Sequence, residues 1–464
     1  MSYNKYNVTT DYTRQLSHYI ATTKYDDILP AVLERAKMLV LHTLGVSLCA
    51  VDLPQSQDTL AIAREMSAGG GQGVATLWGD GTKVSAEAAG FAGGALADML
   101  DWEDCAWAGH PSAAVIPASV IAAEAFGKSG KDLLTAVVVA YEVYHRVGMA
   151  AKSNINGVNI FAAVPAVAKL MDLNEEQINK ALSMATACAA IPVGGHGSTM
   201  SDSLNYFYGL KVNNAFSICL SAKLGIANMM DAFDVPSAYL AHLKGPNPDW
   251  FLKDLGDDYL MMNVLVKHWP ANFYVQTYVE LADRINKKHH IDPDQIESIT
   301  ICPTVGSRYF TMDEGFHSLT HAQFCINYGV AAYFYHPESG SIWYQEKTMT
   351  DPRIVSLSKR VIGQEVFDQP GGKWRNLIQG SHPEKFMTVR MKDGTEYTES
   401  LFTHKGHPSY MFTREEFHDE FRSAVRKILS PAEAEKVITL VQGLDKLDSV
   451  AELCDSLYHK NGAQ

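Results

Sequence analysis

LDWEDCAWAGHPSAAVIPA, residues 100–118, is the stretch around which the chain is organised. Asp101, Glu103 and Asp104 stand close together, and a His-Pro-Ser triplet begins at His110. The flanking segments consist almost wholly of small and apolar residues. Charged groups that leave water must be paired or must shift their pKa. Two interpretations therefore stay open: a helix–helix loop with solvated acids, or a buried scaffold that delivers acids and an imidazole to one pocket.

The preceding segment, 86–100, predicts a helix at the centre of the fold. Ser85 is a favourable N-cap residue. The helix contains three interior glycines, Gly90, Gly93 and Gly94. Each glycine costs roughly 1 kcal/mol relative to alanine in a helix interior. We expect close contact with neighbouring helices to offset this cost, so that a central helix aims Asp98 and Asp101 at the acidic stretch.

Outward from this stretch, helical periodicity dominates the chain up to residue 266. The predicted helices fall within residues 9–50, 56–68, 113–127, 131–151, 160–172, 174–190 and 210–225. A further helix is predicted over 321–336. Strand patterns appear at 296–302 and at 386–402, where Asp393-Gly394 predicts a two-residue hairpin turn.

These patterns predict a mainly α protein with two domains. Residues 1–266 and 412–464 should form a large all-helical domain that is discontinuous in sequence. Residues 267–411 should form a smaller α+β domain inserted into it and acting as a lid. A length of 464 residues is sufficient for two or three domains.

Composition narrows the class of protein. The net charge of −13 argues against nucleic acid or an anionic membrane surface as a partner, because both favour a basic face. The seven cysteines contain no CxxC pair, which is typical of reduced thiols. The N-terminus lacks an apolar signal core, and no segment reaches the roughly 18 uninterrupted apolar residues of a membrane helix. We expect a cytoplasmic protein.

Several of these residues resemble the MmgE/PrpD family, and the likeness runs nearly end to end. It is carried by Asp101 after the small-residue helix, His110-Pro111-Ser112, Val115-Ile116-Pro117-Ala118, and the segment 321–336. The segment from Lys267 through Pro270-Ala271 and Phe273 to Gln276-Thr277 most resembles the 2-methylcitrate dehydratases of the family.

The resemblance implies chemistry on small polycarboxylates without metal or organic cofactor, and a homodimer. Such chemistry needs a base for the proton α to a carboxylate, cationic donors for the developing dianion, and an acid. We expect a cofactor-independent lyase of the 2-methylcitrate dehydratase type, acting on a small carboxylate at the interdomain cleft. The alternatives are an isomerase or epimerase on the same fold, and a non-catalytic member that has lost the family chemistry.

The candidate residues follow from position and chemistry. The catalytic candidates are Asp101, His110, Tyr206 and Tyr208, and the substrate-binding candidates are Cys105, Asn159, Lys267, His268 and Gln276. If Asp101 and His110 converge, the carboxylate would support an imidazolium; the alternative is a histidine that caps a helix. The two tyrosines could donate to an oxyanion, although an aromatic run at a helix start is more often core.

Three departures from the family pattern affect the substrate charge that we expect. Asn159 stands where the family usually has a histidine, and 201–204 lacks the lysine that the family places before the glycine matching Gly209. Gln276 stands where decarboxylase-like members have a histidine. A triply negative substrate therefore fits less well here than in the family at large. The histidines form no HExxH pattern, so no metal site is expected.

Overall fold

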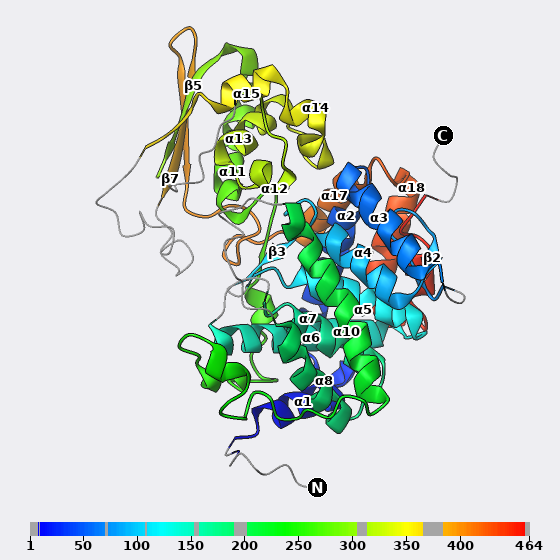
Figure 1. The fold of residues 1–464 in the computed structure, drawn as a ribbon. Coiled ribbons are helices and arrows are strands. Elements are labelled where there is room, and N and C mark those ends of the chain that lie inside the picture. The colour runs from blue at the N-terminus through cyan, green and yellow to red at the C-terminus, as the bar shows by residue number, and fades with distance from the viewer. Residues whose placement is uncertain are drawn as a thin grey trace.

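A computed structural model describes residues 8, 10–69, 73–106, 109–152, 157–189, 202–303, 313–364 and 384–459. The chain is mainly helical, which confirms the predicted class. Figure 1 shows a large body of packed helices and a smaller part, with the main sheet, above it. The helices of the body are α1 (Tyr12–Thr22), α2 (Pro30–Cys49), α3 (Pro54–Ser67), α4 (Ala86–Asp98), α5 (Ser112–Ala125), α6 (Gly130–Ala151), α7 (Ile160–Leu170), α8 (Glu175–Ala185) and α10 (Phe207–Lys223).

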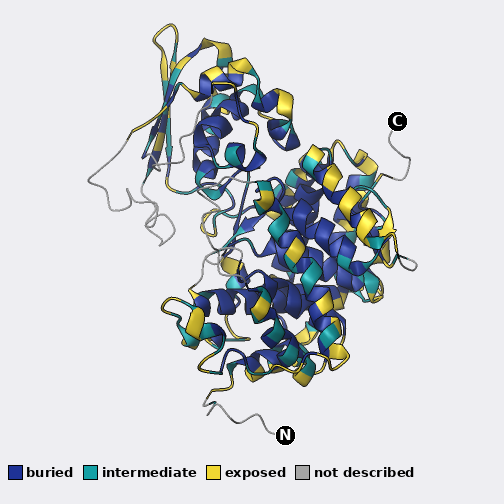
Figure 2. Cartoon of the chain, in the orientation of Figure 1, coloured by how far each residue is buried: buried dark blue, intermediate teal, exposed yellow. Residues whose placement is uncertain are grey.

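Helix α4 is central, as its small residues predicted. Its N-cap is confirmed, because the Ser85 hydroxyl accepts a hydrogen bond from Ala88 N at 3.2 Å. A Cβ atom at Gly94 would lie 2.8 Å from the Tyr208 backbone of α10, and one at Gly93 would lie 2.9 Å from Ile121 of α5. The helix is buried over nearly its whole length (Figure 2). The glycines thus allow two neighbours to approach the α4 backbone.

The smaller part combines a four-stranded sheet with short helices. The strand order is β6 (Val361–Gly363), β5 (Ile296–Cys302), β7 (Lys385–Met391) and β8 (Glu396–Leu401). Strand β6 runs parallel to β5, and the other neighbours are antiparallel. The helices are α11 (Phe273–His289), α12 (Leu319–Gln323), α13 (Ile326–Tyr335), α14 (Glu346–Met349) and α15 (Pro352–Ser358).

Two local predictions in this part were wrong in detail. The single helix over 321–336 is divided into α12 and α13, because Cys325 is the N-cap of α13 and its thiol accepts from Tyr328 N at 3.5 Å. The hairpin turn is longer than two residues: Met391 N donates to Thr395 O at 2.8 Å, and Gly394 has φ of 88°. A glycine with positive φ after a type I turn favours this longer connection.

After the sheet, the chain returns to the body through α17 (Arg414–Val425), α18 (Pro431–Gln442) and α19 (Ala451–Cys454). Helix α17 packs on α2, where a Cβ at Gly45 would lie 2.9 Å from the Phe421 ring. Both α17 and α18 contact α2 (Figure 1). The division of the chain into domains at residues 266 and 411, and the lid role of the smaller part, stay predictions.

No single helix among the described residues is both long and apolar enough to cross a membrane. The pair Pro30–Cys49 and Pro54–Ser67 meets those criteria only when taken together, with a bend of 100° between its members.

The α4–α10 contact can be tested with Gly94→Ala. The added methyl meets backbone atoms of Tyr208 and Gly209, which cannot move as a flexible side chain would. Overpacking typically costs about 1–3 kcal/mol, against a gain of about 1 kcal/mol in helix propensity. We expect the free energy of unfolding to fall by up to about 2 kcal/mol in urea denaturation. The control Gly69→Ala, where a Cβ has nothing within 4 Å, should change it by less than about 0.5 kcal/mol. Equal effects of the two substitutions would contradict close packing at Gly94.

Candidate active site

The acidic stretch is joined to a distant segment by a short β-ribbon. Strand β3 (Asp104–Cys105) pairs antiparallel with β4 (Leu265–Val266). Lys267 follows β4, and its backbone N–H donates to Glu103 O at 3.4 Å. This pairing places Lys267 beside acids that precede it by more than 160 residues.

The ammonium group of Lys267 is fully buried between two carboxylates. It donates to the Asp101 carboxylate, to Asp101 O at 2.8 Å and to Glu103 Oε1 at 2.6 Å. Burial alone lowers the pKa of Lys267, but Asp101 and Glu103 outweigh it and raise that pKa. Because an ammonium has three N–H groups, these contacts use all of them.

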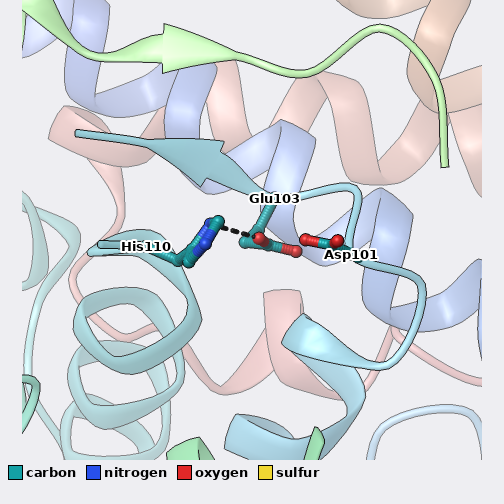
Figure 3. Close-up of side chains that lie close together, drawn as sticks. All are labelled: Asp101, Glu103 and His110. Atoms are coloured by element: carbon teal, nitrogen blue, oxygen red, sulfur yellow. Dashed lines mark ion pairs between the residues drawn. The ribbon is translucent and has the colours of Figure 1, made fainter. Parts of the chain in front are cut away.

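Glu103 also orients His110. The Nδ1 atom of His110 lies 2.6 Å from Glu103 Oε1 and 3.1 Å from Asp104 O (Figure 3). A carboxylate and a carbonyl only accept, so Nδ1 must carry the proton, and the lone pair of the neutral ring is on Nε2. Within the described part of the chain, Nε2 has no hydrogen-bonding partner. His110 is also the accessible member of the group, with 17% of its side chain exposed against 0% for Glu103.

The two carboxylates beside Lys267 differ in their protonation equilibria. Burial raises the pKa of Asp101, and the attraction to Lys267 does not fully offset it. Burial also acts to raise the pKa of Glu103, but Lys267 and His110 outweigh it and lower that pKa to about 2. Opposite shifts in neighbouring acids are typical of sites where one carboxylate stays ionised while another exchanges a proton.

Each of these two carboxylates also has one oxygen atom that is buried and unpaired among the described residues. Among the described residues, Asp101 Oδ2 and Glu103 Oε2 have no hydrogen-bonding partner. Asp101 has φ of 48°, a backbone conformation that non-glycine residues seldom adopt. Unpaired buried oxygens are costly unless something else binds them. The partly exposed His110 is therefore the member of this group that a substrate can reach, and Asp101 Oδ2 and Glu103 Oε2 are unpaired acceptors buried in the same group.

Two other acids of this region have different roles. Asp104 is structural: its Oδ1 accepts from Ser112 N at the start of α5 at 2.9 Å, and its Oδ2 accepts from the Tyr141 hydroxyl at 2.7 Å. Asp98, at the end of α4, is buried. Burial, together with the charges of Glu103 and Asp101, raises its pKa well above the usual range. The predicted delivery of Asp98 and Asp101 to one place is confirmed.

Asp101 and His110 converge, as expected, but the carboxylate that contacts the imidazole is Glu103. In the sequence, Glu103 is only one of the acids of this stretch. No simple period in the sequence marks its contact, because Asp101 has a left-handed backbone conformation and residues 101–103 lie outside β3.

Tyr208 and Asn159 lie beside His110, whereas Tyr206 does not. The Tyr208 ring meets the His110 ring edge-on, with centroids 6.4 Å apart, and its hydroxyl is hydrogen-bonded to Asn159. Tyr206 instead stacks on Phe91, and its hydroxyl donates to Gln55 O of α3 at 3.4 Å. Only one tyrosine of the aromatic run is therefore placed near the imidazole.

The Cys105 thiol stays protonated, and the Gln276 amide holds the local structure. Burial raises the pKa of the Cys105 thiol to about 12, so the thiolate is disfavoured. Both polar atoms of the Gln276 amide bind the loop before α11: Oε1 accepts from the backbone N–H of residues 268 and 269, and Nε2 donates to the carbonyls of 269 and 271. No donor or acceptor group of Gln276 is left for a substrate without breaking this loop.

His268 links two helices instead of facing the catalytic group. Its Nδ1 lies 3.2 Å from Glu280 of α11, and its Nε2 lies 3.2 Å from Glu420 of α17. Burial alone lowers the pKa of His268, but Glu420 and Glu280 outweigh it and raise that pKa to about 10. The imidazolium therefore joins the smaller part to a C-terminal helix that packs on the body.

The side chains of Asp101, Glu103 and His110 also have the composition of a metal site. One ligand atom from each lies within 4.8 Å of the others. Lys267, however, already places a positive charge against both carboxylates. A divalent ion bound to the same carboxylates would lie close to this buried ammonium and would be repelled by it. These residues therefore fit an ammonium better than a metal ion.

Comparison with known proteins places this geometry in context. The family model described as the MmgE/PrpD N-terminal domain matches residues 14–250, and that of the MmgE/PrpD C-terminal domain matches residues 269–446. Cis-aconitate decarboxylase of Mus musculus is 23% identical, over 95% of this chain and 92% of its own length. The Homo sapiens enzyme of that name is 24% identical, over 95% and 93%. That of Aspergillus terreus is 21% identical, over 97% and 96%.

The His268 contact predicts a pH dependence of stability. Because the folded-state pKa is about 10 and an unfolded histidine titrates near 6.5, the imidazolium stabilises the fold fully below about pH 6.5. This contribution is lost as the pH rises from about 6.5 towards 10. In urea denaturation, His268→Gln should therefore destabilise the protein by on the order of 3 kcal/mol more at pH 6 than at pH 9.5.

The matched control is His18→Gln. His18 Nδ1 also bonds a glutamate oxygen, at 2.9 Å, but on the surface, with 63% of the side chain exposed. Exposed ion pairs contribute about 0–1 kcal/mol, so this substitution should have a small effect at either pH. A destabilisation by His268→Gln that is the same at pH 6 and pH 9.5 would contradict the imidazolium between Glu280 and Glu420.

Proposed function

The chain belongs to the MmgE/PrpD family, and on that premise we propose that it is a cofactor-independent lyase acting on a small carboxylate. The relatives compared above, which align along nearly the whole chain, are named as decarboxylases, and decarboxylases of this kind are lyases. The observation that carries the proposal is the Glu103–His110 pair, in which a partly exposed imidazole lies beside the buried carboxylate of Asp101.

In the proposed reaction, His110 transfers the proton. In a dehydration, Nε2 removes a proton from the carbon α to a substrate carboxylate and the electron pair forms the double bond. The leaving hydroxyl takes that proton from the His110 imidazolium and departs as water, which returns the ring to its neutral form. In a decarboxylation, the imidazolium instead protonates the carbanion that remains after carbon dioxide leaves. In both cases the ionised Glu103 stabilises the imidazolium through Nδ1.

Asp101 and Lys267 complete the proposed site in different roles. The unpartnered Asp101 Oδ2 is placed to accept a hydrogen bond from the substrate or to exchange a proton with it. Lys267, expected to bind substrate, has its three N–H groups used by Asp101 and Glu103. We therefore propose it as a positioning residue that fixes both carboxylates.

An isomerase or epimerase on the same fold is the second candidate. Asn159, in the place of the usual family histidine, is hydrogen-bonded to Tyr208 next to His110. Asn159 therefore supplies no acid that could protonate a leaving group. An epimerase does not need such an acid, because it only removes a proton from one carbon and returns it. Net release of water or carbon dioxide would decide for the lyase over this candidate.

A homodimer and a cytoplasmic location also stay proposals. The surface supports the first of these, because Leu210 and Leu220 of α10 and the C-cap residue Leu224 are exposed and recur at helical spacing. Exposed apolar residues gathered on one helix face are typical of protein interfaces.

The catalytic claim can be tested with His110→Gln. The enzyme is incubated in deuterium oxide with a panel of small carboxylates that includes cis-aconitate and 2-methylcitrate, and NMR follows loss of substrate and deuterium uptake. Loss of a general acid–base group typically costs about two to four orders of magnitude in rate. We expect such a loss in turnover and exchange, with the melting temperature nearly unchanged.

The surface variant His18→Gln provides the matched control, because it removes another histidine that is bonded to a glutamate. It should retain the rate of the unmodified protein. A folded His110→Gln protein with near-normal turnover would exclude the catalytic role of this histidine.

We expect the activity to be independent of added metal, because Lys267 already places a positive charge against both carboxylates and would repel a divalent ion bound beside it. Incubation with excess EDTA followed by desalting should leave the rate within about twofold of the untreated enzyme, since no metal-bound water is required. Loss of activity that one specific divalent ion restores would show that the Asp101–Glu103–His110 group binds a metal.

A further inference from the structure

The chain returns on itself between Asp104 and Ser112, and this turn carries His110. Asp104 is the first residue of β3, and Ser112 is the first residue of α5. Between them, Ala106 N donates to Gly109 O at 2.7 Å, and Gly109 N donates to Ala106 O at 3.1 Å. The position of His110 therefore depends on how firmly the two ends of this turn are joined.

Asp104 and Ser112 join these ends by a reciprocal pair of hydrogen bonds. Asp104 N donates to Ser112 Oγ at 3.2 Å, and Ser112 N donates to Asp104 Oδ1 at 2.9 Å. Both residues are fully buried, so water does not compete for these groups. The backbone carbonyl of Asp104 in turn lies 3.1 Å from His110 Nδ1. Asp104 thus closes the turn with its side chain and contacts the imidazole with its carbonyl.

The Asp104 carboxylate depends on a hydroxyl from a different helix. Tyr141 of α6 is fully buried, and its hydroxyl donates to Asp104 Oδ2 at 2.7 Å. Burial raises the pKa of Asp104, and the hydrogen bonds from Tyr141 and Ser112 offset this only in part. Without the hydroxyl, Oδ2 would lose its donor, so the carboxylate would turn or take up a proton. Either change would disturb the bond to Ser112.

The next residue of α6 holds the chain on the other side of the β-ribbon. Glu142 accepts from Leu260 N at 3.0 Å and from Met261 N at 2.9 Å, shortly before β4. Glu142 is itself paired with Arg146 at 2.6 Å, one turn further along the helix. Adjacent residues of one buried helix therefore anchor both strands of the β3–β4 pair. Helix α6 is thus a fixed support for the Tyr141 hydroxyl.

We propose that Tyr141 is a positioning residue that acts on His110 through Asp104. Glu103 Oε1, at 2.6 Å from His110 Nδ1, determines which nitrogen carries the proton. The Asp104 carbonyl is a second acceptor, and two acceptors restrict the direction of the Nδ1–H bond more than one does. Tyr141 holds that carbonyl, and through it the direction of Nε2. The effect on turnover rests on the proposed lyase function, whereas the restraint on the ring does not.

Tyr141→Phe tests this role, because it removes one oxygen atom and keeps the ring. Misplacing a catalytic group by about 1 Å can cost about a hundredfold in rate. We expect kcat to fall about ten- to hundredfold with KM within about twofold, because Tyr141 acts on the histidine and not on substrate. In the NMR spectrum of the full-length protein with isotope-labelled histidine, the His110 ring signal should broaden or split. That signal is identified by its loss in His110→Gln.

The matched control is Tyr144→Phe. Tyr144 lies three residues further along α6 and is also fully buried. Within the described residues, however, its hydroxyl has no hydrogen-bonding partner. This variant should keep the kcat and the His110 signal of the unmodified protein.

Two further variants separate positioning from general stability. Ser112→Ala deletes the acceptor of Asp104 N, so it loosens the same turn and should lower kcat about three- to tenfold. The double variant, His110→Gln with Tyr141→Phe, should turn over as slowly as His110→Gln alone. A residue that acts only through His110 has no further effect once the imidazole is gone.

Three results would overturn the assignment. The first is equal kcat and equal His110 signals in Tyr141→Phe and Tyr144→Phe, the second is a loss that appears in KM instead of kcat, and the third is a further loss of rate in the double variant. Failure of the lyase proposal would instead appear as absent turnover in the unmodified protein, while the His110 signal still changes in Tyr141→Phe and not in Tyr144→Phe.

Discussion

The structure of the site depends on one buried ammonium group, that of Lys267. It contacts both Asp101 and Glu103, and it follows directly on the strand that pairs with β3. Without this cation, two carboxylates would be buried side by side, and the desolvation and repulsion would favour protonation or exposure of one of them. With it, Glu103 stays ionised and can orient His110. The histidine thus depends on a lysine that it does not contact directly.

Helix positions were largely predictable because their signals are local. Ser85 begins α4 as expected, and the glycines of α4 lie at the contacts with α5 and α10 that their cost implied. The break between α12 and α13 was not predictable, because a cysteine thiol is an unusual N-cap and the apolar pattern continues through it. Where a local cap and a periodic pattern disagree, the pattern alone overestimates helix length.

The sequence predicted which residues lie in the candidate site better than it predicted their contacts. Asp101 and His110 come from the same stretch, but their arrangement depends on pairing with β4, which no local pattern reveals. Tyr206 and Tyr208 share one helix start, and the rotation of α10 against α4 decides which ring faces His110. Gln276 occupies a position where some family members carry a histidine, yet its amide is used by the adjacent loop. Residue type at a matched position therefore does not establish its contact with substrate.

The segment that follows β4 is held by charge pairing at two adjacent residues. Lys267 contacts Asp101 and Glu103, and His268 lies between Glu280 of α11 and Glu420 of α17. Two neighbouring residues therefore connect the catalytic group to two helices outside it. Two regions are thermodynamically coupled only if they favour different arrangements of the element between them. Here that element is a short segment whose position is set by ion pairs with both regions, so a change of charge at either pair acts on the same backbone.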